Sequence, residues 1–238
     1  MNLKETDVLP YALTSVSGAP DVWVFAPHPD DEVFGCGGAL ALHAMRGALV
    51  RVVLLTEGEQ QVVDSSCVTT SVRQRESVKA ASVLGYTELT CWQLPDRGVH
   101  FGEVLVERVM ACLVQTPLSV VYAPSLWEAH PDHRACGMAV AEAIRRLGGS
   151  RELWFYEVSA PLRANALIDV TSVWPAKTQA MACFASQEAV LPYSEYISAL
   201  NRYRALTVLP QGRVEAFERY SAAELTAFAI DSPGDALR

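Results

Sequence analysis

Short apolar runs alternate with longer amphipathic stretches up to about residue 158, and this alternation limits the folds that the chain can adopt. Each run is too short for a typical helix, is rich in Val, Leu, Trp or Tyr, and is bounded by turn residues. Strands are therefore expected at residues 22–26, 51–56, 89–94, 118–123 and 152–158. Helices are expected between them, at residues 37–45, 72–84, 103–115 and 134–147. This order predicts an α/β fold, a Rossmann-like three-layer sandwich whose mostly parallel central sheet is covered by helices on both faces.

Beyond residue 158 the pattern is weaker. It indicates a strand at residues 166–170, helices at 174–184 and 193–205, and either a closing strand or the start of a helix at 213–220. Residues 60–71 are polar and rich in Ser and Thr, so we expect a long mobile loop there, at the rim of any site that the strands form.

Size and charge narrow the class of protein. The chain has 238 residues, 50% of them hydrophobic, which suits a single domain over residues 1–238 with a well-buried core. Its net charge of −8 gives no general attraction to phosphate backbones, so no nucleic-acid partner is expected. No apolar stretch reaches the roughly 18 residues that cross a bilayer, so no integral membrane segment is expected.

The cysteines and the N-terminal residues indicate a compartment. The six cysteines are spread singly, without a Cys-x-x-Cys pair, which favours reduced core thiols over a disulfide framework. The N-terminal residues lack the charged and apolar regions of a signal peptide. We therefore expect a cytoplasmic protein.

Two clusters of His and Asp follow two of the expected strands. Residues 27–32 read Pro-His-Pro-Asp-Asp-Glu after the first strand, and residues 130–133 read His-Pro-Asp-His after the fourth. Because ligands bind at the carboxyl ends of the strands in an open parallel sheet, the two clusters are expected to form one site.

The residue types in these clusters suit a catalytic zinc ion, which takes three protein ligands and leaves a position for water. His28 and Asp31 can point at one metal ion across the strand–helix turn, and His133 can complete the set. Asp30 then remains beside the metal as a general base for water. His130 is placed to stabilise an oxyanion and to protonate a leaving amine, with Asp132 orienting its ring and raising its pKa.

Other interpretations compete for some of these residues. The carboxylates after His28 could cap a helix, at about 0.3–1 kcal/mol each, but capping leaves the histidines unexplained. For Glu32 alone, capping or support of the site is an equally good interpretation. Gly35, Gly37 and Gly38 could cradle a phosphate, yet the spacing is not Gly-x-Gly-x-x-Gly, so close helix packing is favoured. Phosphoryl transfer with magnesium is disfavoured because imidazole suits zinc better.

The two clusters resemble those of the PIG-L/LmbE-like zinc-dependent de-N-acetylases, which include the deacetylases of GlcNAc-phosphatidylinositol, mycothiol and bacillithiol synthesis. The resemblance runs through about residues 20–188. Residues 56–59 look like the family's Thr-Asp-Gly-Glu, with the longer Glu57 in place of Asp near the site. Residues 94–96 (Leu-Pro-Asp) and Lys177 also follow the family's order.

The resemblance implies an LmbE-like fold and assigns roles to particular residues. It implies that His28, Asp31 and His133 bind zinc and that Asp30 is the general base. His130 would stabilise the tetrahedral intermediate with Asp132 behind it. Two further residues match positions that contact substrate in relatives, Arg75 and Asp96, although a salt bridge within its helix explains Arg75 equally well.

The expected function is a zinc-dependent hydrolase that removes the N-acetyl group from an N-acetylglucosamine-type sugar in a small-molecule conjugate. Fe²⁺ could occupy the same ligands, and a homo-oligomer is compatible with the sequence. An alternative is an amidase that cleaves a larger acyl group or a thiol–sugar conjugate. A non-catalytic carbohydrate-binding relative would have lost Asp30 or a metal ligand, and none is lost.

Overall fold

The apolar runs of the sequence pair into one seven-stranded sheet in the computed structural model, which describes residues 4–7, 9–58, 69–86 and 88–226. The strand order is β3-β2-β1-β4-β5-β7-β6. Strands β1 to β5 pair in parallel, whereas β7 runs antiparallel between β5 and β6. The strands are β1 (Asp21–Ala26), β2 (Leu49–Thr56), β3 (Glu88–Leu94), β4 (Ser119–Pro124), β5 (Glu152–Tyr156), β6 (Ala166–Asp169) and β7 (Val214–Ser221).

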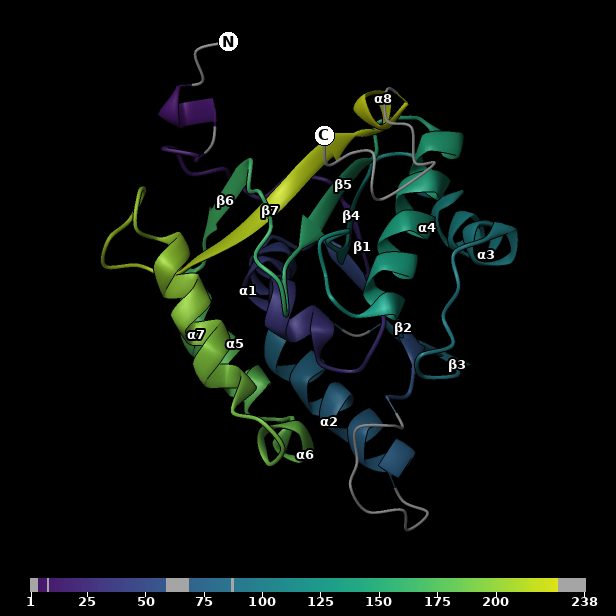
Figure 1. Ribbon diagram of the computed structural model, residues 1–238, viewed down its shortest axis with the longest axis horizontal. Coiled ribbons are helices and arrows are strands. Elements are labelled where there is room, and N and C mark those ends of the chain that lie inside the picture. The colour runs from purple at the N-terminus through teal and green to yellow at the C-terminus, as the bar shows by residue number, and fades with distance from the viewer. Residues whose placement is uncertain (1–3, 8, 59–68, 87, 227–238) are drawn as a thin grey trace.

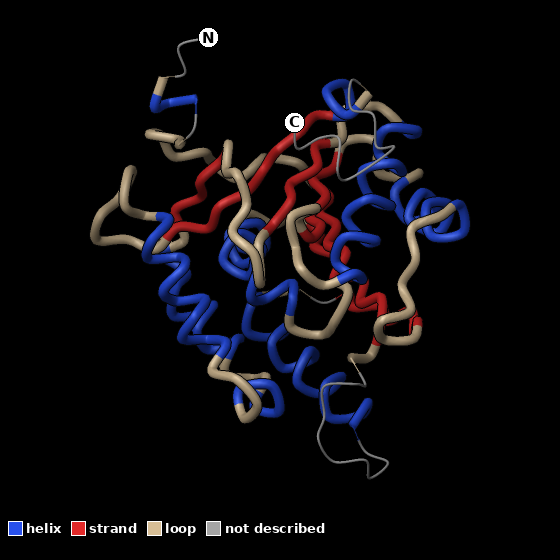
Figure 2. The backbone as a smooth tube through the Cα atoms, viewed as in Figure 1, coloured by secondary structure: helices blue, strands red, loops and turns tan. Residues whose placement is uncertain are grey.

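Helices cover both faces of this sheet, as Figures 1 and 2 show. One apolar core lies between the sheet and a layer that includes α1, α2 and α5, and the other lies between the sheet and α3, α4 and α8. The predicted three-layer architecture is therefore confirmed. The helices are α1 (Asp31–Met45), α2 (Thr69–Leu84), α3 (Glu103–Leu113), α4 (Pro131–Leu147), α5 (Trp174–Met181), α6 (Ala185–Glu188), α7 (Tyr193–Arg204) and α8 (Ala222–Leu225), with 3-10 turns at Glu5–Asp7 and Thr171–Val173.

The structure settles the open points of the sequence pattern. Residues 214–220 belong to a strand, β7, and not to a helix. Residues 69–71 open α2, so the expected loop ends earlier than residue 71, and residues 60–68 lie outside the described part of the chain. The first helix begins at Asp31, six residues before the expected start, because the glycines that follow lower the helical signal without preventing the helix.

Glycine in α1 allows the helix to pack directly on the sheet. A Cβ atom at Gly35 would lie 2.2 Å from the ring of Tyr156, and one at Gly38 would lie 2.6 Å from Val170. The interpretation as close packing is thus confirmed for Gly35 and Gly38, whereas a Cβ atom at Gly37 would make only ordinary contacts, the nearest with Leu84 at 3.4 Å.

A buried ion pair supports α1 at a kink. Cys36 has non-helical dihedral angles, which leaves polar backbone groups free on both sides of it. Glu215 accepts a hydrogen bond from Gly38 N at 2.7 Å, and Lys177 donates one to Phe34 O at 2.9 Å. Lys177 Nζ and Glu215 Oε1 lie 2.6 Å apart and both side chains are fully buried. This pair therefore fixes the direction of the first turn of α1.

A buried histidine on α1 should make stability depend on pH. Burial lowers the pKa of His43 to about 4, and its Nε2 lies 2.9 Å from Tyr122 Oη. Below the unfolded pKa of about 6.5, the unfolded chain binds a proton that the native ring does not, so stability falls as pH falls towards 4. The loss should reach about 3 kcal/mol. Urea denaturation should show that the free energy of unfolding falls less between pH 7 and pH 4.5 in His43→Gln than in the unmodified protein. Equal falls in the two proteins would mean that His43 titrates normally.

Among the described residues, no helix combines the length and the apolar character that crossing a membrane requires.

Candidate metal centre and active site

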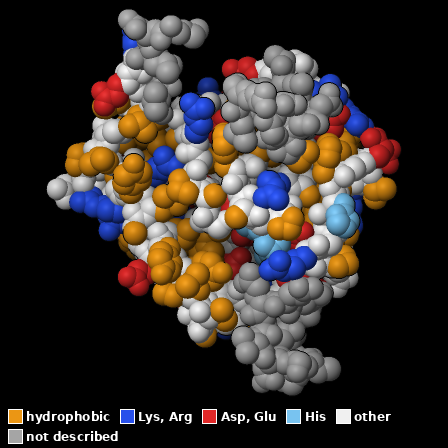
Figure 3. Space-filling model, viewed as in Figure 1, with side chains coloured by type: hydrophobic (Ala, Val, Ile, Leu, Met, Phe, Trp, Pro, Cys, Tyr) orange, Lys and Arg blue, Asp and Glu red, His pale blue; other side chains and the backbone are white. Residues whose placement is uncertain are grey.

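The site lies where the strand order of the sheet reverses. β1 and β4 are neighbours, and β2 and β5 lie on their opposite sides. The carboxyl ends of β1 and β4 therefore meet at the position where open α/β sheets usually bind ligands. A cavity of about 320 Å³ lies there, and Figure 3 shows imidazole and carboxylate side chains gathered in a hollow on this face. Its lining includes His28, Asp30, Asp31, Arg73, His130 and His133.

Three buried side chains form a triangle of possible ligand atoms. His28 Nδ1 lies 3.2 Å from Asp31 Oδ2 and 3.2 Å from His133 Nε2. His133 Nε2 lies 3.2 Å from Asp31 Oδ2. The local cause is the sharp turn after β1, in which His28 N donates a hydrogen bond to Asp31 Oδ2 at 2.9 Å. The structure thus brings together the three residues predicted as metal ligands.

The dimensions of this triangle fit a tetrahedral metal ion. Zinc bonds of about 2.0–2.1 Å to nitrogen and oxygen place the ligand atoms of a tetrahedron about 3.3 Å apart. Two facing imidazole nitrogens cannot both donate to one another and to a carboxylate, whereas a shared cation would accept a lone pair from each of the three atoms. His28, His130 and His133 also offer one ligand atom each within 4.8 Å of one another.

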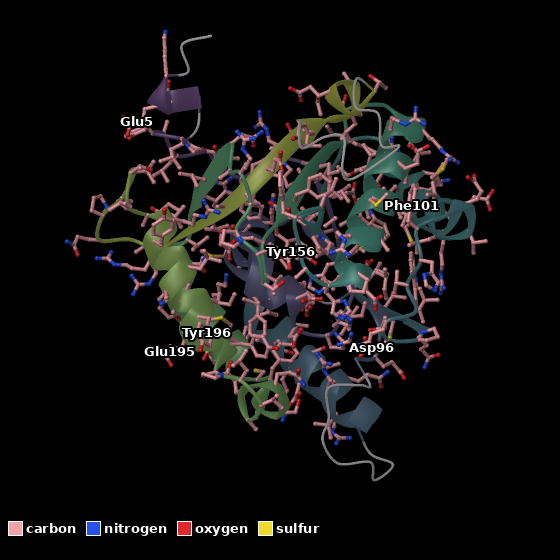
Figure 4. All side chains as sticks on the ribbon, viewed as in Figure 1. Glu5, Asp96, Phe101, Tyr156, Glu195 and Tyr196 are labelled. Atoms are coloured by element: carbon pink, nitrogen blue, oxygen red, sulfur yellow. The ribbon has the colours of Figure 1, made fainter. Side chains whose placement is uncertain are left out.

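Two buried carboxylates hold the ring of His28 from behind. His28 Nε2 lies 3.2 Å from Asp96 Oδ1 and 3.5 Å from Asp132 Oδ2. These contacts favour the tautomer with the proton on Nε2, which leaves the Nδ1 lone pair directed at the triangle. Asp96 comes from the loop after β3 (Figure 4). It was expected to contact substrate, and the structure places it against His28, one of the residues predicted to bind a metal.

A second group of possible metal ligands shares the same imidazole. His28, Asp96 and Asp132 offer ligand atoms within 4.8 Å of one another. However, Asp132 is fully buried, and its Oδ2 already accepts a hydrogen bond from Arg97 N at 2.7 Å. The triangle with Asp31 borders the cavity instead, so the geometry favours it as the metal position.

Asp30 lies beside the triangle and borders the cavity. Its Oδ2 accepts a hydrogen bond from Arg73 Nη2 at 3.0 Å, and no described residue hydrogen-bonds its Oδ1. Burial raises the pKa of Asp30 to about 7, against the opposing effect of Arg73. A carboxylate with a pKa in this range is suited to accept a proton near neutral pH.

Glu32 holds the backbone of Asp30 in an uncommon conformation. Asp30 has φ 118°, which non-glycine residues rarely adopt, and its N–H donates to Glu32 Oε2 at 3.2 Å. The other oxygen of Glu32 accepts a hydrogen bond from Tyr86 Oη at 3.0 Å. Burial raises the pKa of Glu32 to about 8. These contacts favour support of the site over simple helix capping for Glu32.

His130 caps α4 and borders the cavity. Its Nδ1 accepts a hydrogen bond from Asp132 N at 3.2 Å, so a neutral His130 carries its proton on Nε2. Burial lowers the pKa of His130, and the imidazoles of His28 and His133 lower it further. The charge of Asp132 raises this pKa, as expected, but burial and the two imidazoles outweigh it, so the net change is downward. The carboxylate of Asp132 faces His28 and Arg97 N, and only its backbone orients His130.

Arg73 is a residue of the site that the sequence interpretation missed. Its guanidinium donates to Pro29 O at 2.6 Å and Gly58 O at 2.9 Å, in addition to Asp30. Gly58 has φ 65°, and a Cβ atom there would lie 1.8 Å from Arg73 Nη1, so only glycine allows this contact. Arg73 therefore ties the loop after β2 to the base of the cluster.

Helical periodicity could have identified Arg73. Buried residues recur along α2 at positions 73, 77, 80 and 84, the spacing of one helix face. Arg75 lies two residues from Arg73, on a different face, and is exposed. The structure does not bring Arg75 into the cluster. The side chain of Glu57 does not join the cluster either, since its carboxylate accepts hydrogen bonds from Gln74 Nε2 at 3.0 Å and Gln93 Nε2 at 3.1 Å.

Glu128 is a second residue that the sequence interpretation missed. It precedes the second cluster by two positions, is buried, and its Oε2 lies 3.3 Å from His133 Nδ1. The residue type carries no signal by itself, because the contact depends on how the loop after β4 folds back.

Known proteins share both the sequence pattern and the fold. The family model described as GlcNAc-PI de-N-acetylase (PIG-L) matches residues 23–144, just over half of the chain. A probable N-acetyl-α-D-glucosaminyl L-malate deacetylase 2 of Bacillus anthracis is 29% identical over 186 residues, which cover 71% of this chain and 81% of the relative. A 4-oxalmesaconate hydratase of Pseudomonas putida is 24% identical over 196 residues, which cover 71% of this chain and 75% of the relative.

The fold is shared with a solved deacetylase structure. The N,N′-diacetylchitobiose deacetylase of Pyrococcus horikoshii superimposes with a TM-score of 0.77, over 87% of this chain and 85% of that one. At 22% identity this similarity shows the fold. The extent of the family match shows more: the chain belongs to the GlcNAc-PI de-N-acetylase (PIG-L) family.

Proposed function

We propose that this protein is a zinc-dependent N-deacetylase that releases acetate from an N-acetylglucosamine-type sugar held in a small-molecule conjugate. The observation that carries the proposal is the triangle of His28, Asp31 and His133, with edges of 3.2 Å and Asp30 beside it. An amidase that removes a larger acyl group, or acts on a thiol–sugar conjugate, is the alternative within the same chemistry.

The metal would be held by His28 Nδ1, Asp31 Oδ2 and His133 Nε2. Two imidazoles and one carboxylate are ligands that zinc favours, and Fe²⁺ accepts the same set. When bound, such an ion polarises a carbonyl group and increases the acidity of water. The remaining steps fall to the side chains around it.

Asp30 would act as the general base. Arg73 holds one oxygen of its carboxylate, and the oxygen without a partner among the described residues is free to take a proton from the attacking water. As the carbon–nitrogen bond breaks, the protonated Asp30 would return that proton to the leaving amine. This role was first expected of His130, whose lowered pKa makes the ring a poorer proton donor. The products are then a carboxylic acid and a free amine.

His130 would stabilise the oxyanion of the tetrahedral intermediate. Because its Nδ1 accepts the N–H of Asp132, the neutral ring presents Nε2–H as a donor. A donor of this kind in a site sheltered from water stabilises developing negative charge more than it does in bulk solvent.

Replacing His130 with alanine should lower kcat by about 10²-fold or more, the scale of losing one oxyanion donor. Zinc content should remain unchanged, because His130 is outside the proposed ligand triangle. Steady-state kinetics together with metal analysis would test this. His130→Gln, which retains an N–H donor, should recover part of the rate. A near-normal rate in the alanine variant would remove His130 from the mechanism.

The relatives define the assay for the proposed function. One relative is named for a glucosaminyl malate and another for diacetylchitobiose, so the panel should contain N-acetylglucosamine conjugates with acidic, neutral and sugar acceptors. The hydratase among the relatives supplies a competing reaction to assay beside them. The expected result is acetate release by zinc-loaded protein, and release slowed by at least about 10²-fold in Asp30→Asn. Hydration of 4-oxalmesaconate without acetate release would overturn the proposal.

A further inference from the structure

Glu128 lies in the loop between β4 and α4 and is 1% exposed. Its backbone is held in place, since Glu128 O accepts a hydrogen bond from Arg134 Nη1 at 2.8 Å. The carboxylate is therefore a fixed group within the protein, and it contacts two different parts of the site.

One part is the 158–160 loop, which consists of Val158, Ser159 and Ala160 after β5. Glu128 Oε1 accepts hydrogen bonds from Val158 N at 2.6 Å, Ser159 N at 3.1 Å and Ala160 N at 3.4 Å. The hydroxyl of Ser159 donates to Oε2. Successive N–H groups arranged around one anion form a concave site that holds the backbone in a single conformation. The shape of the loop thus depends on this carboxylate.

The other part is the ring of His133. Glu128 Oε2 lies 3.3 Å from Nδ1, while Nε2 of the same ring faces Asp31 and His28 at 3.2 Å. A carboxylate behind a ligating imidazole keeps the proton on the far nitrogen and turns the lone pair of the near nitrogen towards the metal. Glu128 is close enough to do this for His133, whose Nδ1 makes no hydrogen bond within the described part of the chain.

The 158–160 loop also forms part of the cavity wall, because Val158 and Ser159 border the same space as Asp30 and His130. One carboxylate therefore fixes both a proposed metal ligand and the wall that faces the substrate. A shift of His133 on metal binding would be transmitted through Glu128 to the loop.

We propose that Glu128 is a positioning residue that couples metal binding at His133 to the conformation of the 158–160 loop, and so to the shape of the substrate cavity. The inference rests on the proposed metal-dependent function. It adds a residue that acts on the reaction only through its neighbours.

Glu128→Gln is the sharpest test of the contact with His133. The amide offers one acceptor oxygen in place of two, so it cannot serve both the ring and the three N–H groups of the loop. Zinc affinity of the full chain, measured by chelator competition, should fall about 10- to 100-fold. Glu103→Gln is the matched control, since Glu103 is exposed and pairs with Arg146. Its zinc affinity should equal that of the unmodified protein.

Hydrogen exchange tests the coupling itself. Zinc loading should slow amide exchange in the 158–160 loop of the unmodified protein and of Glu103→Gln, and Glu128→Gln should lose this response. Ser159→Ala removes one bond to the loop and leaves the His133 contact. It should therefore retain zinc affinity within about threefold while the exchange response weakens, which keeps the test available if Glu128→Gln folds poorly.

The outcomes separate this inference from the proposed function. Zinc affinity of folded Glu128→Gln within about twofold of the unmodified value would overturn the coupling. The coupling would also be overturned if amide exchange in the 158–160 loop of Glu128→Gln or Ser159→Ala responded to zinc as it does in the unmodified protein. Unmodified protein that binds no zinc would instead overturn the proposed metal-dependent function, and the coupling with it.

Discussion

Asp30→Asn should lower kcat by about 10²- to 10⁴-fold, the contribution expected of a general base, while zinc remains bound. Asparagine is the appropriate replacement because Asp30 has φ 118°, and Asn tolerates positive φ better than most residues. Its amide oxygen can still accept the hydrogen bond from Arg73, so the change removes the proton acceptor with little change in shape. Steady-state kinetics and metal analysis of the same preparation would measure both effects.

Asp31→Asn is the matched comparison for this variant. The two residues are adjacent, both are buried, and the chemical change is identical, yet only Asp31 has an oxygen 3.2 Å from both imidazoles of the triangle. Asp31→Asn should therefore lose metal, and Asp30→Asn should not. Loss of zinc from Asp30→Asn would mean that the roles of the two carboxylates had been exchanged.

His133→Ala should weaken zinc binding by at least about 100-fold. The substitution would remove one of the three proposed protein ligands. Even residues that only orient ligands contribute about 10- to 100-fold to metal affinity. Chelator competition gives the affinity, and metal content after gel filtration gives the occupancy. Activity should fall in proportion to occupancy at limiting zinc and recover in part when zinc is added in excess.

Two histidine variants serve as controls for His133→Ala. His100 is exposed and outside the cluster, so His100→Ala should bind zinc normally. His130→Ala should also retain zinc but lose rate. If His133→Ala retained normal zinc affinity, the proposed coordination would be wrong, and the second group of His28, Asp96 and Asp132 would become the better candidate.

Several parts of the fold could be predicted because their signals are local. The inner parallel strands β1, β2, β4 and β5 are mostly apolar runs, as burial on both faces of a sheet requires. The edge strand β3 is partly exposed and includes polar residues. The start of α1 at Asp31 was missed because glycine has a low helix propensity, and its packing against Tyr156 is a tertiary contact. The place of β7 between β5 and β6 was also beyond the sequence, since strand order depends on long-range pairing.

The amino-acid sequence by itself determined the chemistry available to this protein: His28, Asp30, Asp31, His130 and His133 stand in two motifs at the ends of two strands. Only the tertiary structure decided which side chains surround them. Arg73 and not Arg75 reaches Asp30 because one helix face is buried and the other is exposed. Asp96 faces the ring of His28 because loops distant in sequence meet at one edge of the sheet. Glu128 faces the ring of His133 because the loop after β4 folds back on the start of α4. Ligand identity is a property of residue type, whereas the orientation of each ligand depends on contacts that only the folded chain brings together.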